Sequence, residues 1–148
     1  MSGSKVLVTG GSGFIGSSLV KALLRAGCSV RVLDDNSRGN PRRLSDVKND
    51  IEFIAGDIRD AAAVKSAACG MDEVHHLAFV NGTEFFYNAP DLVLDVGVRG
   101  MINVIDACRK QNVGTLLLAS SSEVYQTPPK IPTDESAPLV VPDPQTPR

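Results

Sequence analysis

The sequence predicts an α/β fold in which a doubly wound parallel sheet is covered by helices on both faces. Short apolar runs alternate with longer stretches of helical periodicity along most of the chain. A glycine-rich segment joins the first apolar run to the first helical stretch. The 148 residues, 43% hydrophobic and 22% charged, have the size and composition of about one globular domain. Strands that are apolar throughout favour a parallel sheet, and right-handed crossovers make that sheet doubly wound.

The first elements are clear from local signals. Lys5–Thr9 is a buried strand, and Phe14–Ala26 is a helix because its apolar residues recur at three- and four-residue intervals. Gly27 ends this helix. Ser29–Asp34 is the second strand, and Pro41 opens a short helical turn after it.

The remaining elements follow the same alternation: strands Ile51–Ala55, Glu73–Leu77 and Thr115–Ser120, and helices Ala61–Ala68 and Pro90–Gln111. Asp60 and Asn88 stand where N-terminal caps are expected. After Tyr125, seven prolines fall within the last 21 residues and exclude a helix there. We therefore expect one domain over residues 1–127 and an extended, proline-rich tail over residues 128–148.

Composition excludes several classes of function. Fifteen basic and 17 acidic residues give a net charge of −2 with no basic stripe, which argues against a nucleic-acid partner. No apolar run approaches the roughly 20 residues of a membrane span, and the first strand begins too early for a signal peptide. The three cysteines are widely spaced, which favours small core residues over disulfides or a metal site. A reducing, cytoplasmic location fits best.

The glycine-rich segment Thr9–Gly16, read Thr-Gly-Gly-Ser-Gly-Phe-Ile-Gly, is the most informative part of the chain. It follows a strand and opens a helix, which is the context of a dinucleotide-binding turn. Glycines let the backbone approach a diphosphate closely, and the first-turn amides of the helix face it. No Gly-Lys-Ser/Thr follows, so a kinase-type phosphate loop is excluded. The segment indicates a Rossmann-type fold, here truncated after its fifth strand.

Asp34 ends the second strand, 18 residues after Gly16. An acidic residue at about this distance binds the adenosine ribose hydroxyls and repels a 2′-phosphate, which favours NAD over NADP. Arg38 could pair with a 2′-phosphate, so NADP stays open as the less favoured alternative. Asp35 is interpreted as a solvated loop carboxylate.

The chain resembles the extended short-chain dehydrogenase/reductase family, particularly its NAD-dependent nucleotide-sugar epimerases and dehydratases. The resemblance rests on five segments in the family's order: Thr9–Gly16, Asp34–Gly39, Gly56–Asp60, His76–Ala78 and Ala119–Tyr125. It implies an enzyme in which NAD transiently oxidises a sugar hydroxyl by taking a hydride from the carbon that carries it. It also implies a nucleotide-sugar substrate and, for the full-length protein, a homodimer.

The same resemblance assigns roles to individual residues. Asp57 would meet the adenine amino group, and Ser121 would be the catalytic donor that holds the developing oxyanion. The cofactor-binding candidates from the glycine segment, the acidic position and the family segments are Gly10, Ser12, Gly13, Phe14, Ile15, Gly16, Asp34, Asn36, Ser37, Arg38, Asp57, Ile58, Leu77, Ala78 and Phe79.

The family's catalytic base, a tyrosine followed four residues later by a lysine, has no counterpart in this sequence. Counting from Ser121 places it near Thr146, where the chain reads Pro-Gln-Thr-Pro-Arg. Tyr87 and Tyr125 are followed four residues later by aspartate and proline. We therefore expect a cofactor site but no completed reaction from these 148 residues, and an exposed sheet edge.

Two positions depart from the family pattern. Gly97 replaces an asparagine that helps to hold the cofactor region, and Phe79 replaces a small alanine. The adjacent His75 and His76 point to opposite faces of a strand and cannot share a metal, so no metal site is expected. The aromatic segment Thr83–Tyr87 is interpreted either as a border of the nicotinamide and sugar site or as an apolar cover for the sheet.

Two alternatives to the enzyme remain. The first is a dinucleotide-binding or sensing module without turnover, favoured by the absent tyrosine and lysine. The second is an NADP-linked reductase of the same fold, favoured by Arg38.

Overall fold

The computed structural model describes residues 3–141, and these form two compact units, the first ending at Leu118 and the second beginning at Ala119. The sequence favoured a boundary after residue 127. The first unit contains the whole sheet, and each unit is described below by itself.

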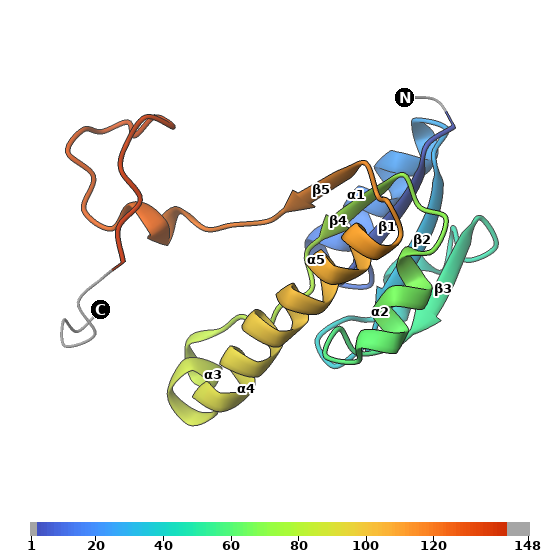
Figure 1. Ribbon diagram of the computed structural model, residues 1–148, viewed down its shortest axis with the longest axis horizontal. Helices are drawn as coiled ribbons and strands as arrows, with labels where there is room; N and C mark the ends of the chain where they lie inside the picture. Colours follow the sequence, from blue (N-terminus) through green and yellow to red (C-terminus); the bar gives the residue numbers. More distant parts are fainter. Residues whose placement is uncertain (1–2, 142–148) are drawn as a thin grey trace. The chain divides into compact units, whose positions relative to one another are not determined.

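The first unit is a five-stranded, all-parallel sheet with helices on both faces (Figure 1). Its strands are β1 (Lys5–Thr9), β2 (Ser29–Asp34), β3 (Ile51–Ala55), β4 (Glu73–His76) and β5 (Thr115–Leu118). Its helices are α1 (Phe14–Arg25), η1 (Pro41–Leu44), α2 (Ala61–Ala68), α3 (Thr83–Asn88), α4 (Pro90–Leu94), η2 (Asp95–Arg99) and α5 (Gly100–Lys110). The strand order β3-β2-β1-β4-β5 confirms the doubly wound prediction.

Two apolar layers bury the central strands. On one face, Leu7 and Val74 pack with residues of α2 and α5. On the other face, Val6 and Val8 pack with Val20 of α1 and with residues around η1. Neighbouring residues of β1 alternate between the two layers, as the period of two in a strand requires. The sequence therefore supplies a continuous apolar run where both faces are covered.

The strand order reverses between β1 and β4, because β2 and β3 lie on one side of β1 and β4 and β5 on the other. Doubly wound sheets bind ligands at the carboxyl ends of their strands, at such a switch point. The glycine segment follows β1, and the segment from Leu77 follows β4, so both meet there.

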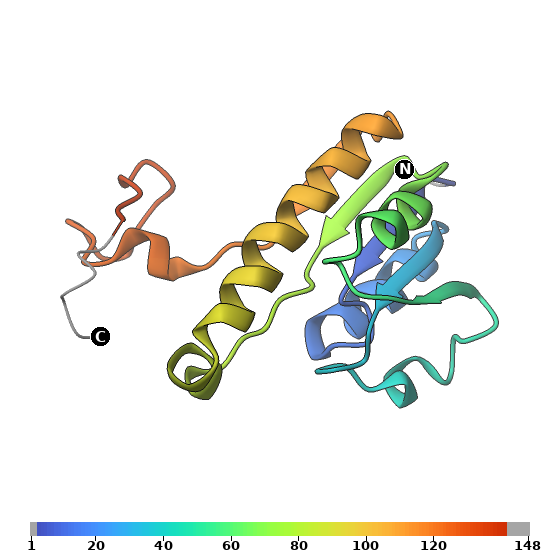
Figure 2. The same ribbon diagram turned by 60° about the horizontal axis from the view of Figure 1, so that its bottom comes forward.

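The long helix predicted over Pro90–Gln111 differs in detail. It consists of α4, a single turn of π-helix over Asp95–Arg99 (η2) and α5, which Figure 2 shows as one continuous rod. The aromatic segment Thr83–Tyr87, interpreted as a border of the nicotinamide and sugar site or as an apolar cover, forms α3. A π-turn shifts one hydrogen bond by a residue and is frequent at functional sites.

Two further predictions need correction. Cys28 and Cys108 are buried as expected, but Cys69 is exposed because it caps the end of α2 instead of packing beneath it. β5 is shorter than predicted and all four of its residues are exposed. Within the described residues it pairs only with β4, so the exposed edge expected from the sequence is present.

The second unit contains η3 (Ser122–Tyr125), a short 3₁₀ turn, followed by irregular chain. The amide of Val140 donates to the carbonyl of Val124 at 2.8 Å, which folds this unit back on itself.

Candidate functional site

A groove opens at the carboxyl ends of β1, β2, β3 and β4. Ten of the residues predicted to bind a cofactor line it: Gly10, Gly13, Asp34, Ser37, Arg38, Asp57, Ile58, Leu77, Ala78 and Phe79. Six others were not predicted: Leu33, Asp35, Gly39, Gly56, Val80 and Val96. The predicted residues Ser12, Phe14, Ile15, Gly16 and Asn36 are not among the lining residues.

The glycine turn is tight enough to exclude side chains. Gly10 has φ +73°, and an ideal Cβ there would lie 2.8 Å from the backbone nitrogen of Ala78. An ideal Cβ at Gly16 would overlap the carbonyl oxygen of Gly10. The amide of Gly13 donates to that same carbonyl at 3.1 Å, which closes the turn. A bare concave backbone of this kind fits a diphosphate.

Helix α1 begins at this turn without a side-chain cap, since Gly13 makes no capping hydrogen bond. The first amides of a helix have no acceptor within the helix, and they carry its positive dipole end. The side chains of Phe14 and Ile15 are 80% and 69% exposed. Any role of Phe14 and Ile15 toward an anion therefore belongs to their backbone amides.

Ser12 connects the glycine turn to the loop after β2. It is fully buried, and its hydroxyl donates to the Asn36 side-chain oxygen at 2.9 Å. Its carbonyl accepts from the amide of Asn40 at 3.0 Å. Ser12 and Asn36 thus shape the groove from behind its surface.

Asp34 faces the glycine turn. Its Oδ2 accepts from the amide of Ser12 at 2.9 Å, and its Oδ1 accepts from the amide of Asn36 at 2.8 Å. The residue is 7% exposed and lines the groove. An ideal Cβ at Gly39 would overlap the Ser12 hydroxyl and lie 3.0 Å from Asp34 Oδ1, so only glycine allows this loop to close over the carboxylate.

Arg38 is engaged away from Asp34. One of its Nη atoms donates to the carbonyl of Asn81 at 2.8 Å, and the guanidinium lies 4.7 Å from the centroid of the Phe85 ring. Such a cation–π contact fixes the side chain's direction. Arg38 therefore joins the β2 loop to α3, a helix that the sequence did not predict.

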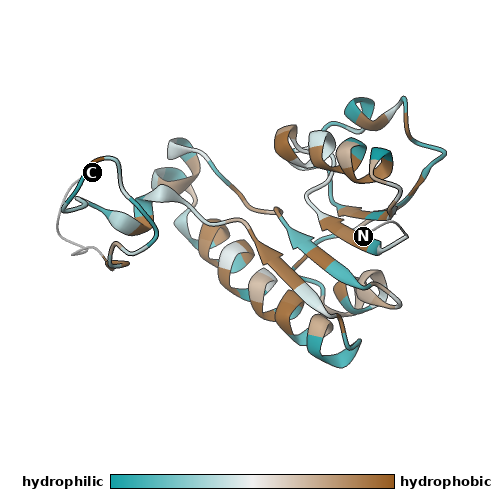
Figure 3. Cartoon of the chain, turned by 90° about the horizontal axis from the view of Figure 1, so that it is seen from above, coloured by the Kyte–Doolittle hydropathy of each residue, from teal (hydrophilic) through white to brown (hydrophobic). Residues whose placement is uncertain are grey.

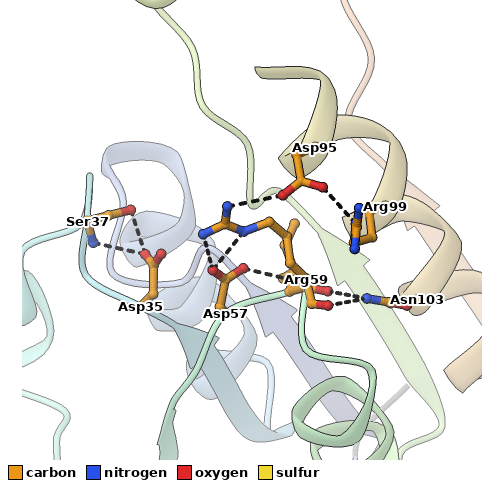
Figure 4. Close-up of polar contacts among 8 residues, drawn as sticks. Asp35, Ser37, Asp57, Arg59, Asp95, Arg99 and Asn103 are labelled. Carbon is orange, nitrogen blue, oxygen red and sulfur yellow. Dashed lines mark hydrogen bonds and ion pairs between the residues drawn. The ribbon is translucent and has the colours of Figure 1, made fainter. Parts of the chain in front are cut away.

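Asp57 belongs to a chain of charged side chains that reaches the π-turn (Figure 4). Arg59 donates to Asp57 Oδ2 from Nε at 2.8 Å and to Asp95 from Nη1 at 3.2 Å. Arg99 contacts the other oxygen of Asp95 at 2.7 Å. The hydrogen bond from Arg59 lowers the pKa of Asp57 below its usual value, so this carboxylate is charged and fixed in place.

Asn103 of α5 completes this connection. Its amide nitrogen donates to the carbonyls of Ile58 and Arg59 at 3.0 and 2.9 Å. The segment beside Asp57 is therefore connected to the long helix twice, through the Arg59–Asp95 contact and through Asn103, as Figure 4 shows.

A buried pair, Thr9 and His76, holds the ends of β1 and β4 together. The Thr9 hydroxyl oxygen accepts from the amides of Leu77 and Ala78, both at 3.3 Å. The same hydroxyl forms a hydrogen bond with His76 Nδ1 at 2.7 Å. Burial lowers the pKa of His76 to about 4, so the ring is neutral at physiological pH.

His75 lies on the opposite face, where its Nε2 is 3.2 Å from a carboxylate oxygen of Glu73. Among residues 3–141, no group of three or more His, Cys, Asp or Glu side chains is placed to bind a metal ion. Over the same residues, no helix is long and apolar enough to cross a membrane.

Ser121 belongs to the second unit, where it is the N-cap of η3 and its hydroxyl accepts from the amide of Glu123 at 3.2 Å. Tyr125 ends the same turn. The position near Thr146, where the resemblance places the tyrosine base, lies outside the described residues.

Known proteins resemble this chain in sequence. The profile of the NAD dependent epimerase/dehydratase family matches residues 6–147. UDP-glucose 4-epimerases from Lactobacillus helveticus and Mycolicibacterium smegmatis are 36% and 37% identical over 91% of this chain. The chain spans 41% and 44% of their lengths.

Solved structures agree. A UDP-glucose 4-epimerase from Thermus thermophilus in complex with NAD superimposes with a TM-score of 0.81 at 32% identity, over 92% of this chain and 44% of that one. A dTDP-glucose 4,6-dehydratase from Streptomyces venezuelae with NAD bound gives 0.83 at 30% identity, over 91% and 45%. The glycine turn, the acidic end of β2 and these matches together show that the chain belongs to the NAD dependent epimerase/dehydratase family.

Proposed function

We propose that this chain is the cofactor-binding part of an NAD-dependent nucleotide-sugar epimerase or dehydratase that acts by transient hydride transfer at a sugar hydroxyl. One observation carries the proposal: the Asp34 carboxylate points toward the glycine turn and accepts from the amide of Ser12, at the switch point of the sheet. Named relatives act on UDP-sugars, which makes a UDP-sugar the favoured substrate.

Different residues of the groove bind different parts of NAD. The glycine turn and the first amides of α1 take the diphosphate, and Asp34 accepts from the adenosine ribose hydroxyls. Asp57 and the backbone of Ile58 line the adenine end. NAD, when bound, supplies the hydride acceptor for the sugar carbon.

NAD is favoured over NADP because of what surrounds Asp34. A 2′-phosphate would meet this carboxylate at close range. Arg38, the one nearby cation that the sequence suggested for a 2′-phosphate, is engaged by Asn81 and Phe85 instead. A reductase that prefers NADP is therefore the less favoured function.

Ser121 is proposed as the donor that holds the oxyanion developing on the sugar. The proposal rests on the segment Ala119–Tyr125 and its resemblance to the family's motif. The resemblance places the tyrosine that would move the hydroxyl proton near Thr146, with a lysine four residues later, and this sequence has neither residue there. The 148 residues alone are accordingly proposed to bind NAD without turning over a sugar.

A homodimer is proposed through the long helix. Leu94, Val98, Ile102 and Ile105 are spaced by three or four residues and are all exposed, which gives α4–α5 an uncovered apolar stripe. Figure 3 shows apolar and polar positions alternating along the long helix. Two copies of this helix would bury the stripe against each other. Sedimentation of a protein that continues through the tyrosine–lysine segment, with and without Ile102→Lys, tests this, because the added charge should shift that protein to the monomer.

A cytoplasmic location is also part of the proposal, as the three scattered cysteines suggest.

Isothermal titration calorimetry tests the cofactor assignment. We expect NAD to bind with one site per chain, and NADP to bind more weakly. A protein that continues through a tyrosine–lysine segment should in addition interconvert or dehydrate a UDP-sugar. Absence of binding to either dinucleotide would reject the proposed function.

A further inference from the structure

The groove runs along the carboxyl ends of three neighbouring strands. The glycine turn follows β1, Asp34 ends β2, and Asp57 comes shortly after β3, while β2 lies between β1 and β3 in the sheet. Adjacent strands are about 5 Å apart, so a dinucleotide with its diphosphate on the glycine turn and its ribose on Asp34 carries its base to Asp57. The apolar residues Ile58 and Val96 also line the groove beside Asp57.

The Asp57 carboxylate has one acceptor site left for a ligand. A carboxylate offers about four lone-pair sites, two on each oxygen. Oδ2 accepts from Arg59 Nε at 2.8 Å and from Arg59 Nη2 at 2.5 Å, and Oδ1 accepts from the Arg59 amide at 2.8 Å. Over residues 3–141 these are the donors to this carboxylate. Oδ1 therefore keeps one site, and the Asp57 side chain is 30% exposed in the wall of the groove.

Arg59 is held from its other side by the long helix (Figure 4). Its Nη1 donates to Asp95 Oδ2 at 3.2 Å, and Asp95 lies in the π-turn. The guanidinium is planar and its donors have fixed directions. Because Asp95 holds one end of this rigid group, the other end fixes the plane of the Asp57 carboxylate.

We propose that Arg59, anchored on Asp95, is a positioning residue that aims the remaining acceptor site of Asp57 at the amino group of adenine and makes the site selective against 6-oxopurines. This inference rests on the proposed function. The adenine amino group can donate to Oδ1. Hypoxanthine, a 6-oxopurine, has a carbonyl oxygen at the same place, which cannot donate and would face the negative charge.

Calorimetric binding of NAD and of nicotinamide hypoxanthine dinucleotide, in which a carbonyl replaces the adenine amino group, tests the proposal. We expect the unaltered chain to bind NAD more tightly by about tenfold or more. Arg59→Lys keeps the positive charge but loses the planar fork, so the ratio of the two affinities should fall severalfold. A merely structural role of Arg59 would weaken both dinucleotides alike. An unchanged ratio in Arg59→Lys would therefore overturn the assignment.

Arg31→Lys is the matched control. Arg31 also joins a carboxylate to a helix, since its Nε donates to Glu52 at 2.7 Å and its Nη1 to the carbonyl of Ala67 in α2 at 2.7 Å. Neither Arg31 nor Glu52 is among the groove-lining residues. Arg31→Lys should lower the thermal unfolding midpoint, as Arg59→Lys does, but leave the affinity ratio unchanged. Equal falls of the ratio in the two variants would refute the role of Arg59.

Asp57→Asn tests whether Arg59 acts through the carboxylate. The asparagine amide can present either a donor or an acceptor to the base, so the preference for adenine should disappear. Arg59→Lys should then change the affinity ratio less than it does in the unaltered chain. Equal changes in both backgrounds would show that Arg59 does not act through Asp57.

The failures of the two proposals are distinguishable. Binding of NAD without any preference over the hypoxanthine dinucleotide would overturn the positioning role and keep the proposed function. Absence of binding of either dinucleotide would reject the proposed function, and the role of Arg59 with it.

Discussion

Replacement of Asp34 by asparagine should weaken both the fold and the cofactor site. The carboxylate accepts two backbone hydrogen bonds, from Ser12 at 2.9 Å and Asn36 at 2.8 Å, at a position that is 7% exposed. An amide has one acceptor atom, so its nitrogen would face one of these two amide donors. A buried donor left without its charged acceptor costs about 1–3 kcal/mol.

For a chain of this length, that cost lowers the unfolding midpoint by roughly 3–10 °C. The affinity for NAD should also fall, because the ribose hydroxyls lose a charged acceptor. Each 1.4 kcal/mol of lost interaction weakens the affinity about tenfold. Differential scanning fluorimetry measures the first effect, and calorimetric titration with NAD measures the second.

Asp35→Asn is the matched control for the effect on stability. Asp35 is exposed, and its carboxylate accepts only from the amide and hydroxyl of Ser37 two residues later. Its replacement should change stability by no more than about 0.5 kcal/mol. Equal melting of Asp34→Asn and Asp35→Asn would refute the structural role given to Asp34, and an unchanged NAD affinity of Asp34→Asn would refute its role toward the ribose.

Three further predictions concern pH, cofactor choice and assembly. Because burial lowers the pKa of His76 to about 4, the unfolded chain binds more protons between pH 6.5 and 4, and stability should fall as the pH drops through this window, by about 2 kcal/mol between pH 7.5 and 5. Urea unfolding at these two pH values should show this loss, and an equal loss in His76→Gln would contradict it. Arg38→Ala should change NADP affinity no more than NAD affinity, because Arg38 is held by Asn81; a selective loss of NADP binding would favour the reductase instead. The 148-residue chain should associate or precipitate, since Leu116–Leu118 of the edge strand β5 are exposed, and a monodisperse monomer in sedimentation would refute this.

The sheet could be predicted from the sequence because most of its strands are short apolar runs that alternate with helical stretches; β4, which reads Glu-Val-His-His, is the exception. The parallel strands and the doubly wound arrangement follow from the alternation with helices and from right-handed crossovers. The glycine turn and Asp34 were also predictable, since a bare turn between strand and helix and an acid at the end of the second strand have local signatures.

Other features depend on contacts between distant segments and have no local signature. The sequence showed Gly97 only as a departure from the family's asparagine, whereas in the structure the ring of Phe79, from the segment after β4, occupies the space of a side chain there. The π-turn and α3 escaped prediction because a shifted hydrogen bond and a six-residue helix leave little periodicity. Gly39 was recognised only as part of a family segment. Its closeness to Ser12 and Asp34 shows why glycine stands there.

The central claim is that the glycine turn and the first amides of α1 seat the diphosphate of NAD. Two-dimensional NMR of the chain, with backbone amides assigned over residues 10–16 and titrated with NAD, tests it most directly. The account predicts large shifts at Gly13, Phe14 and Ile15 that saturate together with the calorimetric binding curve, and similar shifts with ADP. Saturation by NAD with these amides unmoved would contradict it.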